Sequence, residues 1–369
     1  MNKKITLFNT YIHTSAFKNV KSVLDSGFLS EGKLVKEFEK ELSEKLGLTN
    51  PVAVNSGTSA LHLALVLAGV GPGDEVILPS QTFIATGLAV LYVGAKPVFA
   101  DIEYDTGNID PKDIKRKITK KTKAIIPVHW NGYPCDLDEI NKIAKGHKLI
   151  VIEDAARALG ATYKGKPIGS LSHFTCFSFQ AIKHLTTGDG GAICSKNLLD
   201  AKKSKTLRWF GINREKAKPS LLGERIFNIS EIGYKYHLND YAAAFGSANL
   251  ENFKKRIAKR QRFAAMYKKA LGKIPGIQLF KEDNYCKSAY FLFGLHVERR
   301  NNFIRALKDK GIPTTIDTFG LNHHKVFSKY KTNLPVNKKF NETQINLPVH
   351  DGLTEKKIKY IIDIIKKGW

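Results

Sequence analysis

The chain has 369 residues, of which 43% are hydrophobic and 25% charged, as is ordinary for a globular protein long enough for two domains. Its net charge of +25 is unusual, but the 59 lysines and arginines are spread along the whole chain, which argues against a nucleic-acid-binding patch. The longest uncharged apolar stretch, residues 83–95, is too short to cross a membrane, and no apolar leader opens the chain. The four cysteines lack the spacing of a metal site. We therefore expect a cytoplasmic protein with reduced thiols, no metal, no nucleic-acid partner and no membrane span.

The first two thirds of the chain alternate between helical patterns and apolar runs. A helix is expected over residues 35–46, where Val35, Phe38 and Leu42 share one face and Gly47 can end the helix. Strands are expected at residues 76–79, 97–100, 124–128 and 149–152, with helices near 82–93, 111–120 and 136–145. This rhythm predicts βαβ units around a buried, mostly parallel sheet. Two further β-like runs lie within residues 172–195.

The pattern changes after about residue 240. One long helix is expected over residues 240–271, followed by a strand over 290–297, a helix near 301–310 and a final helix with an apolar stripe at Ile358, Ile361, Ile362 and Ile365. That last helix is basic and amphipathic, and we expect its stripe to dock on a small domain rather than on a membrane surface. The sequence thus predicts an α/β protein with a large domain over residues 1–245 and a smaller α+β domain over residues 246–369.

Chemically distinctive residues follow the expected strands. Parallel sheets bind ligands beyond the carboxyl ends of their strands. One strand ends in Glu153 and Asp154, and another ends in His129. His129 is equally consistent with a buried, fully hydrogen-bonded histidine and with a residue of the site. Asp154 is a candidate for the site, although an aspartate is also a preferred helix cap.

A third strand leads directly into a helix through the residues Asn-Ser-Gly-Thr-Ser at positions 55–59. The first turn of a helix presents unpaired N–H groups and the positive end of the helix dipole, which together favour an anion. Gly57 permits close approach of a ligand to the backbone, and Thr58 and Ser59 add hydroxyl donors. The stretch is not a P-loop, because it lacks the GxxxxGK[ST] pattern.

A lysine, Lys183, lies between an apolar run and the glycine-rich turn at residues 188–191. Nothing in the local structure requires a lysine there. An anion site, a carboxylate at a strand end and such a lysine are together what pyridoxal phosphate (PLP) needs: donors for its phosphate, a carboxylate for its pyridinium nitrogen and an amine for a Schiff base. Phe83 follows another strand end and can stack on the ring, although a phenylalanine is more often part of the core.

Seven stretches in order give the chain a family resemblance. It resembles the DegT/DnrJ/EryC1/StrS sugar aminotransferases, which are PLP enzymes of fold type I with a large α/β domain and a small one. The matching stretches cover residues 28–47, 54–65, 80–103, 151–170, 176–195, 231–253 and 345–358.

The resemblance implies a role for each matched position. Lys183 matches the Schiff-base lysine and Asp154 the pyridinium partner. Phe83 matches the aromatic residue that stacks on the cofactor ring. The phosphate donors match Thr58, Ser59 and Ser178, with Gly57 in the same turn. The stretch at residues 233–240 matches a segment that reaches the cofactor phosphate of a neighbouring subunit, which implies a homodimer with shared active sites and a contact from Lys235.

The chain departs from the family pattern at several positions. Arg157 stands where the family usually has glutamine or histidine near the cofactor's phenolic oxygen, and it can stabilise that oxygen or bind a substrate phosphate. Lys235 stands where many members have asparagine. Residues 318–327 also differ, and we expect this region, including His323, to contact the substrate; a metal pair at His323 and His324 lacks a third ligand.

His184 raises the question of reaction type. A branch of the family has histidine at the lysine position and performs dehydration. The spacing to the Gly-Asp-Gly-Gly turn places Lys183 in that position, so transamination is favoured. His184 is then a neighbour that packs near the turn, or a substrate contact together with His129 and His323.

The sequence therefore predicts a PLP-dependent aminotransferase that moves an amino group from an amino acid, expected to be L-glutamate, to a keto sugar. A nucleotide-linked 4-keto-6-deoxyhexose destined for surface glycans is the expected acceptor. One alternative is a PLP-dependent sugar dehydratase, against which Lys183 argues. The other is a non-catalytic regulatory or nucleic-acid-binding protein on the same scaffold, for which no helix-turn-helix, zinc-finger or RNP-like motif is present.

Overall fold

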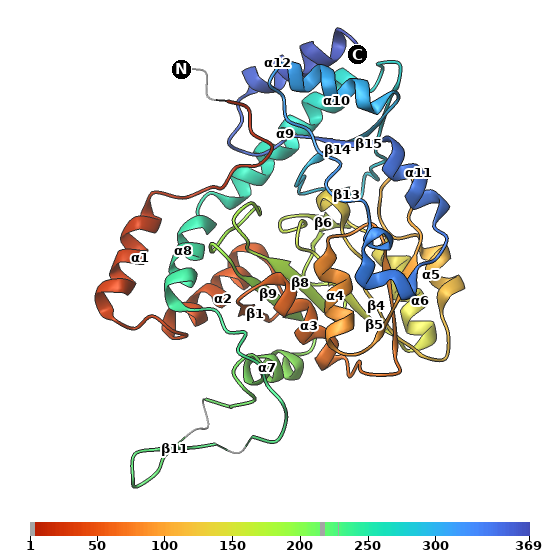
Figure 1. Ribbon diagram of the computed structural model, residues 1–369. Helices are drawn as coiled ribbons and strands as arrows, with labels where there is room; N and C mark the ends of the chain where they lie inside the picture. The colour runs from red at the N-terminus through yellow and green to blue at the C-terminus, as the bar shows by residue number, and fades with distance from the viewer. Residues whose placement is uncertain (1–3, 215–217, 228) are drawn as a thin grey trace.

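The computed structural model describes residues 4–214, 218–227 and 229–369, and a seven-stranded sheet lies at its centre (Figure 1). The strand order is β1-β9-β8-β5-β4-β2-β3, in which β9 runs antiparallel to β1 and β8 and the remaining neighbours are parallel. This confirms the predicted α/β class with a mostly parallel sheet. The strands are β1 (Pro51–Val54), β2 (Glu75–Pro79), β3 (Lys96–Ala100), β4 (Thr122–Ile125), β5 (Ile150–Asp154), β8 (Phe174–Ser178) and β9 (Gly191–Ser195).

Helices cover both faces of this sheet because successive strand side chains point to opposite sides. Ile77 and Val151 pack in one core, while their neighbours Val76 and Ile152 pack in the other. The first core is covered by α2 (Lys33–Leu46), α5 (Pro111–Lys117), α6 (Leu137–His147) and α8 (Asp240–Leu250). The second is covered by α3 (Gly57–Leu67), α4 (Ile84–Tyr92) and α7 (Leu198–Leu207).

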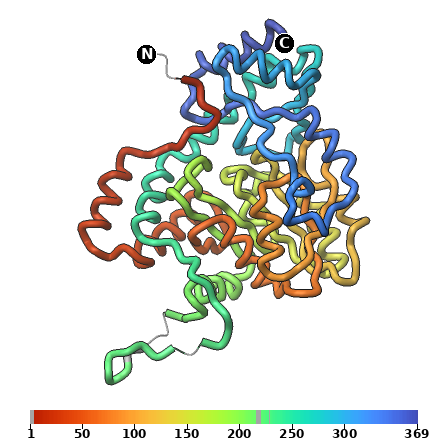
Figure 2. Tube along the Cα trace, in the orientation of Figure 1, coloured from red at the N-terminus to blue at the C-terminus, as the bar shows by residue number. Residues whose placement is uncertain are grey.

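The C-terminal part has its own antiparallel sheet, ordered β12-β14-β15, and its own core. The apolar stripe of the last helix is buried in that core, as the sequence predicted. Figure 2 shows the N-terminal trace passing beside this part, where the backbone carbonyl of Thr6 accepts a hydrogen bond from Nε2 of His350 at 2.9 Å. The elements are α9 (Phe253–Leu271), β12 (Ile277–Leu279), β14 (Phe293–Val297), α10 (Arg300–Asp309), α11 (Pro335–Thr343), β15 (Gln344–Leu347) and α12 (Glu355–Lys366).

Smaller elements complete the fold. The N-terminal helix α1 lies beside α8, and a thin hairpin, β10–β11, projects away from the rest of the chain (Figure 1). Their bounds, with those of the short strands near the sheet, are α1 (Ser15–Ser26), β6 (Thr162–Tyr163), β7 (Lys166–Pro167), β10 (Lys218–Pro219), β11 (Arg225–Ile226) and β13 (Cys286–Lys287). The expected domain boundary at residue 245 lies within α8 and stays a prediction.

Several expected elements were wrong in extent. The strand expected over residues 124–128 is β4, which spans Thr122–Ile125. The single helix over residues 240–271 is two helices, because Glu251 is extended and Asn252 takes a left-handed conformation with φ of 59° between α8 and α9. Asparagine visits this conformation more readily than other non-glycine residues. The strand expected from residue 290 begins at Phe293, since Tyr290 has a φ of 48°, which no β-strand accommodates.

Across the described residues, no helix is long and apolar enough to cross a membrane, and no three His, Cys, Asp or Glu side chains are grouped to hold a metal ion. The four cysteines form no disulfide.

Asp240, the first residue of α8, caps the start of α2. Helix α2 begins after Gly32, which has no side chain to cap it, and Oδ1 of Asp240 instead accepts hydrogen bonds from the backbone N–H groups of Gly32 (2.8 Å) and Val35 (3.1 Å). We predict that Asp240→Ala lowers the free energy of unfolding by about 1–2 kcal/mol, the usual worth of a helix cap. Urea denaturation measures this. Asp363→Ala, an exposed aspartate on α12, is the matched control, and equal destabilisation by both changes would contradict the cap.

Candidate functional site

A cavity of about 370 Å³ lies where the carboxyl ends of β5 and β8 meet the start of α3. This is the position at which parallel sheets hold ligands. The cavity brings together most of the residues predicted for the site: Gly57, Thr58, Phe83, His129, Asp154, Arg157, Ser178 and Lys183. Its wall also contains residues that the sequence did not indicate as site residues, notably Thr86, Trp130, Phe291 and Asp317.

One end of the cavity is an anion cradle. Helix α3 begins there at Gly57, and the side chains of Thr58 and Ser178 line the wall. A Cβ atom on Gly57 would lie 2.9 Å from the Cβ atom of Ser178, so the helix start and β8 can approach this closely because the residue is glycine. Free N–H groups and two hydroxyls at a helix N-terminus form a donor set that suits a phosphate.

Ser59 lies in the same turn but does not line the cavity. Its hydroxyl donates to Oδ1 of Asn55 at 2.6 Å, and its backbone N–H donates to Oγ of Ser56 at 3.0 Å. In this structure Ser59 therefore completes the cap of α3, whereas Thr58 and Ser178 line the cavity.

Asp154 is held in a fixed orientation at the end of β5. Its Oδ2 accepts a hydrogen bond from Oγ1 of Thr86 at 2.7 Å, and its Oδ1 accepts one from the backbone N–H of Ala156 at 3.1 Å. The carboxylate is 7% exposed and lines the cavity. It can therefore present a localised negative charge to a cationic ring nitrogen. Thr86 was missed because it reads as an ordinary residue in the first turn of α4.

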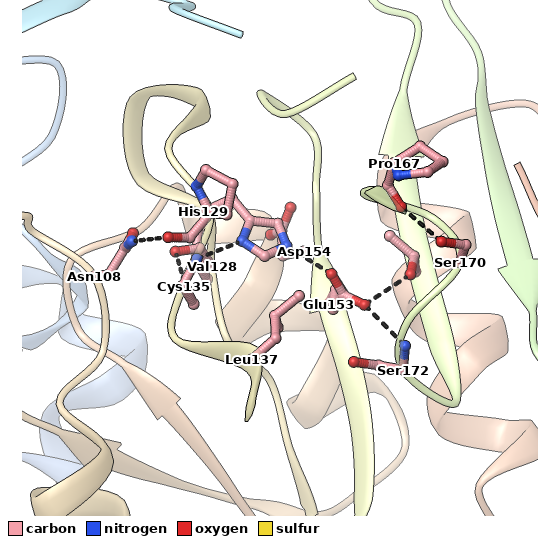
Figure 3. Close-up of polar contacts among 12 residues, drawn as sticks. Asn108, Val128, His129, Cys135, Leu137, Glu153, Asp154, Pro167, Ser170 and Ser172 are labelled. Carbon is pink, nitrogen blue, oxygen red and sulfur yellow. Dashed lines mark hydrogen bonds and ion pairs between the residues drawn. The ribbon is translucent and has the colours of Figure 1, made fainter. Parts of the chain in front are cut away.

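The neighbouring carboxylate, Glu153, points away from Asp154 because the two are adjacent on one strand. Figure 3 shows its contacts: Oε1 accepts from the backbone N–H of Ser172 and Oγ1 of Thr175, and Oε2 lies 2.8 Å from Nε2 of His129. Nδ1 of His129 accepts from the backbone N–H of Cys135 at 3.0 Å, so the ring proton is on Nε2 and is donated to Glu153. Both ring nitrogens of His129 are thus engaged, and the ring offers the cavity an apolar edge.

Lys183 lies in the turn that follows β8. Its Nζ is 4.7 Å from the ring centroid of Phe291, within the cavity wall. Burial, and then the positive charge of Arg157, lower the pKa of Lys183 to about 7, against the opposing effect of Asp154 and Asp317. A large fraction of this amine is therefore neutral near pH 7, where it can act as a nucleophile or a base.

Arg157 follows Asp154 by three residues and lies close to two aromatic rings. Its guanidinium carbon is 5.0 Å from the ring centroid of Trp130 and 5.1 Å from that of Phe291. It forms an ion pair with Asp317, which comes from the C-terminal part of the chain. Asp317 is the one charged residue in positions 311–322, a signal that sequence analysis could have used.

Besides Ser59, three further predicted residues do not line this cavity. His184 is 2% exposed, its Nε2 lies 3.1 Å from the backbone carbonyl of Ala289, and burial holds its pKa well below the usual value, so it is a neutral packing residue behind Lys183. His323 is exposed beside Phe319, at 6.0 Å between ring centroids. Lys235 is exposed on the surface, and its expected contact with a neighbouring subunit stays a prediction.

Comparison with known proteins is consistent with this geometry. The model of the DegT/DnrJ/EryC1/StrS aminotransferase family matches residues 10–366. GDP-perosamine synthase of Caulobacter vibrioides is 37% identical over 305 residues, which are 82% of this chain and 79% of the relative. The crystal structure of AtS13 from Actinomadura melliaura superposes with a TM-score of 0.95 at 35% identity, covering 99% of both chains. A sugar aminotransferase of Streptococcus pneumoniae, Spr1654, is 29% identical, with TM-scores of 0.91 in its PLP form and 0.90 in its PMP form, and 98–99% of each chain is covered.

The chain belongs to the DegT/DnrJ/EryC1/StrS family and is a PLP-dependent sugar aminotransferase. The residues of the cavity fit this cofactor: an anion cradle at α3, a fixed carboxylate at Asp154, and an amine of lowered pKa at Lys183. Phe83, 62% exposed at the cavity edge, is available to cover one face of a ring.

The pKa of Lys183 can be tested without any cofactor. As pH rises through about 7, this amine loses its proton, whereas exposed lysines do so near 10.4. We predict that acylation of Lys183 in the apoprotein, followed by mass spectrometry, reaches half its maximal rate near pH 7. Exposed Lys142 on α6 serves as the internal control. A common midpoint near 10 for both lysines would show that the cavity does not lower the pKa.

The anion cradle depends on close approach at Gly57. We predict that Gly57→Ala weakens PLP binding at least about tenfold, because the added methyl group meets Ser178 and displaces the start of α3 from β8. Gly71→Ala is the matched control, since a Cβ atom there meets nothing within 4 Å. Fluorescence titration of the apoproteins with PLP measures both. If Gly57→Ala binds PLP with wild-type affinity, the start of α3 is not the site that binds the phosphate.

Proposed function

We propose that this protein transfers the amino group of L-glutamate to a nucleotide-linked 4-keto-6-deoxyhexose. The observation that carries the proposal is the amine of Lys183, with its pKa lowered to about 7, in one cavity with Asp154 and an anion cradle. The acceptor class is supported by the similarity to GDP-perosamine synthase, whose name denotes a nucleotide-linked amino sugar. We place the reaction in amino-sugar biosynthesis for surface glycans.

The proposed roles follow from what each side chain can do where it lies. When bound, PLP supplies an electron sink for the carbon that carries the amino group. Asp154 would hold the ring nitrogen, and Thr86 keeps the carboxylate aimed at it. Thr58, Ser178 and the N–H groups of α3 would hold the phosphate, and Phe83 would exclude water from one ring face.

Lys183 would move the proton. Its neutral amine would take the proton from the α-carbon of the donor in the first half of the reaction. In the second half its protonated form would give a proton to the carbon of the sugar that receives nitrogen. A positioned base of this kind contributes about 10²–10⁴-fold to the rate. Near neutral pH the amine can hold or release a proton with little cost, because its pKa is close to the pH.

We also propose that the protein is a cytoplasmic homodimer whose two copies share their active sites. Lys235 of each copy would contact the cofactor phosphate bound by the other copy. Exposed apolar side chains support an interface at α1 and at the β10–β11 hairpin: Phe17, Phe28, Leu221, Leu222 and Ile226 are each at least two thirds exposed in the single chain. Apolar groups gathered in this way favour burial against another protein surface.

The test is an assay with PLP, nitrogen-labelled L-glutamate and a panel of GDP-, dTDP- and UDP-linked 4-keto-6-deoxyhexoses. We predict that mass spectrometry finds the labelled nitrogen in at least one sugar, and that Lys183→Ala lowers the rate by about 10²–10⁴-fold or more. Lys142→Ala, an exposed lysine on α6, is the matched control with wild-type rate.

Other outcomes would contradict the proposal in distinct ways. Loss of water from the sugar without nitrogen incorporation would indicate a dehydratase. Nitrogen incorporation at the wild-type rate by Lys183→Ala would remove the lysine from the reaction.

A further inference from the structure

The ion pair between Arg157 and Asp317 lies inside the cavity and joins two distant parts of the chain. Arg157 belongs to the loop after β5, and Asp317 to the segment between α10 and α11. The two side chains are only 10% and 15% exposed. Both residues line the cavity that contains Lys183. The ion pair therefore fills part of the space that a substrate would enter, and each charge is already neutralised by the other.

The aromatic neighbours of Arg157 leave its N–H groups available to a charged partner. The guanidinium carbon lies 5.0 and 5.1 Å from the ring centroids of Trp130 and Phe291. Contact with a ring face does not use the N–H donors in the plane of the guanidinium, which suit a planar acceptor. In this structure the carboxylate of Asp317 is that acceptor.

The two carboxylates of the cavity differ in how firmly they are held. Asp154 is fixed by Thr86 and by the backbone N–H of Ala156 at the end of a central strand. Asp317 is instead in the loop between α10 and α11, where its backbone has a φ of 65°. Its carboxylate pairs with Arg157. Asp317 is therefore the carboxylate that can move away when a competitor binds Arg157.

We propose that Arg157 is the receptor for a carboxylate of the amino donor, and that Asp317 occupies this receptor as an internal competitor until the donor arrives. This inference rests on the proposed function. Exchange of one carboxylate for another keeps the buried guanidinium paired throughout, which avoids the cost of an unpaired buried charge. It also frees the segment around Asp317 when the donor is bound.

A carboxylate fits this receptor better than the sugar's diphosphate does. Lys183 and Arg157 already face two carboxylates, Asp154 and Asp317, so exchange of Asp317 for a donor carboxylate leaves the charge around Lys183 unchanged. A diphosphate would add negative charge beside the amine. The assignment of Arg157 to the diphosphate is the competing outcome of the test.

The test uses the PLP-loaded enzyme and Asp317→Asn. Asparagine tolerates the left-handed backbone at this position and removes the negative charge. We predict that the KM for L-glutamate falls about tenfold, the effect of an internal partner that occupies the receptor nine-tenths of the time. The KM for the keto sugar should stay unchanged, and Arg157→Lys should raise the KM for glutamate. All variants are assayed at the same pH of about 8, which lies above the pKa of Lys183 in the wild-type chain.

Asp138→Asn is the matched control, because Asp138 forms an exposed ion pair with Lys164 outside the cavity. It should leave both KM values unchanged. The inference is overturned if Asp317→Asn leaves the KM for glutamate unchanged or raises it, or if the KM for the sugar falls instead.

Calorimetric titration with glutarate, a dicarboxylate without an amino group, separates this inference from the proposed function. Asp317→Asn should bind glutarate more tightly than the wild type, and Arg157→Lys more weakly. This readout needs no turnover, so it holds even if no sugar accepts nitrogen. If the wild type transfers nitrogen but all variants bind glutarate with the same affinity, the proposed function stands and the role of Arg157 as carboxylate receptor is overturned.

Discussion

The proposed chemistry depends on one electrostatic arrangement: the amine of Lys183 is held out of water beside the guanidinium of Arg157. Burial and the neighbouring positive charge both favour the neutral amine, and together they lower its pKa to about 7. Asp154 and Asp317 oppose this shift and prevent the pKa from falling further. One cation and two carboxylates, together with burial, thus set the proton affinity of this nitrogen, and each of the three charged groups comes from a different element or loop.

The fold supplies this arrangement through the alternation of side chains along β5. Glu153 points to one side, where Ser172, Thr175 and His129 bind it in a buried network (Figure 3). Asp154 points to the other side, into the cavity. One carboxylate therefore fixes the loops at the strand ends while the next is available to a ligand. A one-residue shift in the register of β5 would exchange these roles, which shows how strictly the site depends on the sheet.

Most of the fold and the centre of the site could be predicted from the sequence, because local signals encode them. Apolar periodicity indicated the sheet and its helices, and the family resemblance pointed to Lys183, which the structure places in the cavity with Asp154. Contacts between residues far apart in sequence were not accessible in this way. Asp317 lies 160 positions from Arg157, and no local pattern joins them. Likewise, the break at Asn252 depends on the conformation of one residue, and the inward direction of Ser59 toward Asn55 depends on the geometry of a single helical turn.

We propose Lys183 as the amine that binds the cofactor and moves the proton. Borohydride reduction of the PLP-loaded protein fixes the cofactor to whichever lysine carries it, and peptide mass mapping then identifies that residue. The account predicts that the added mass lies on the peptide containing Lys183 and on no other lysine in comparable amount. Labelling of another lysine, or no labelling in a protein that binds PLP, would contradict the account.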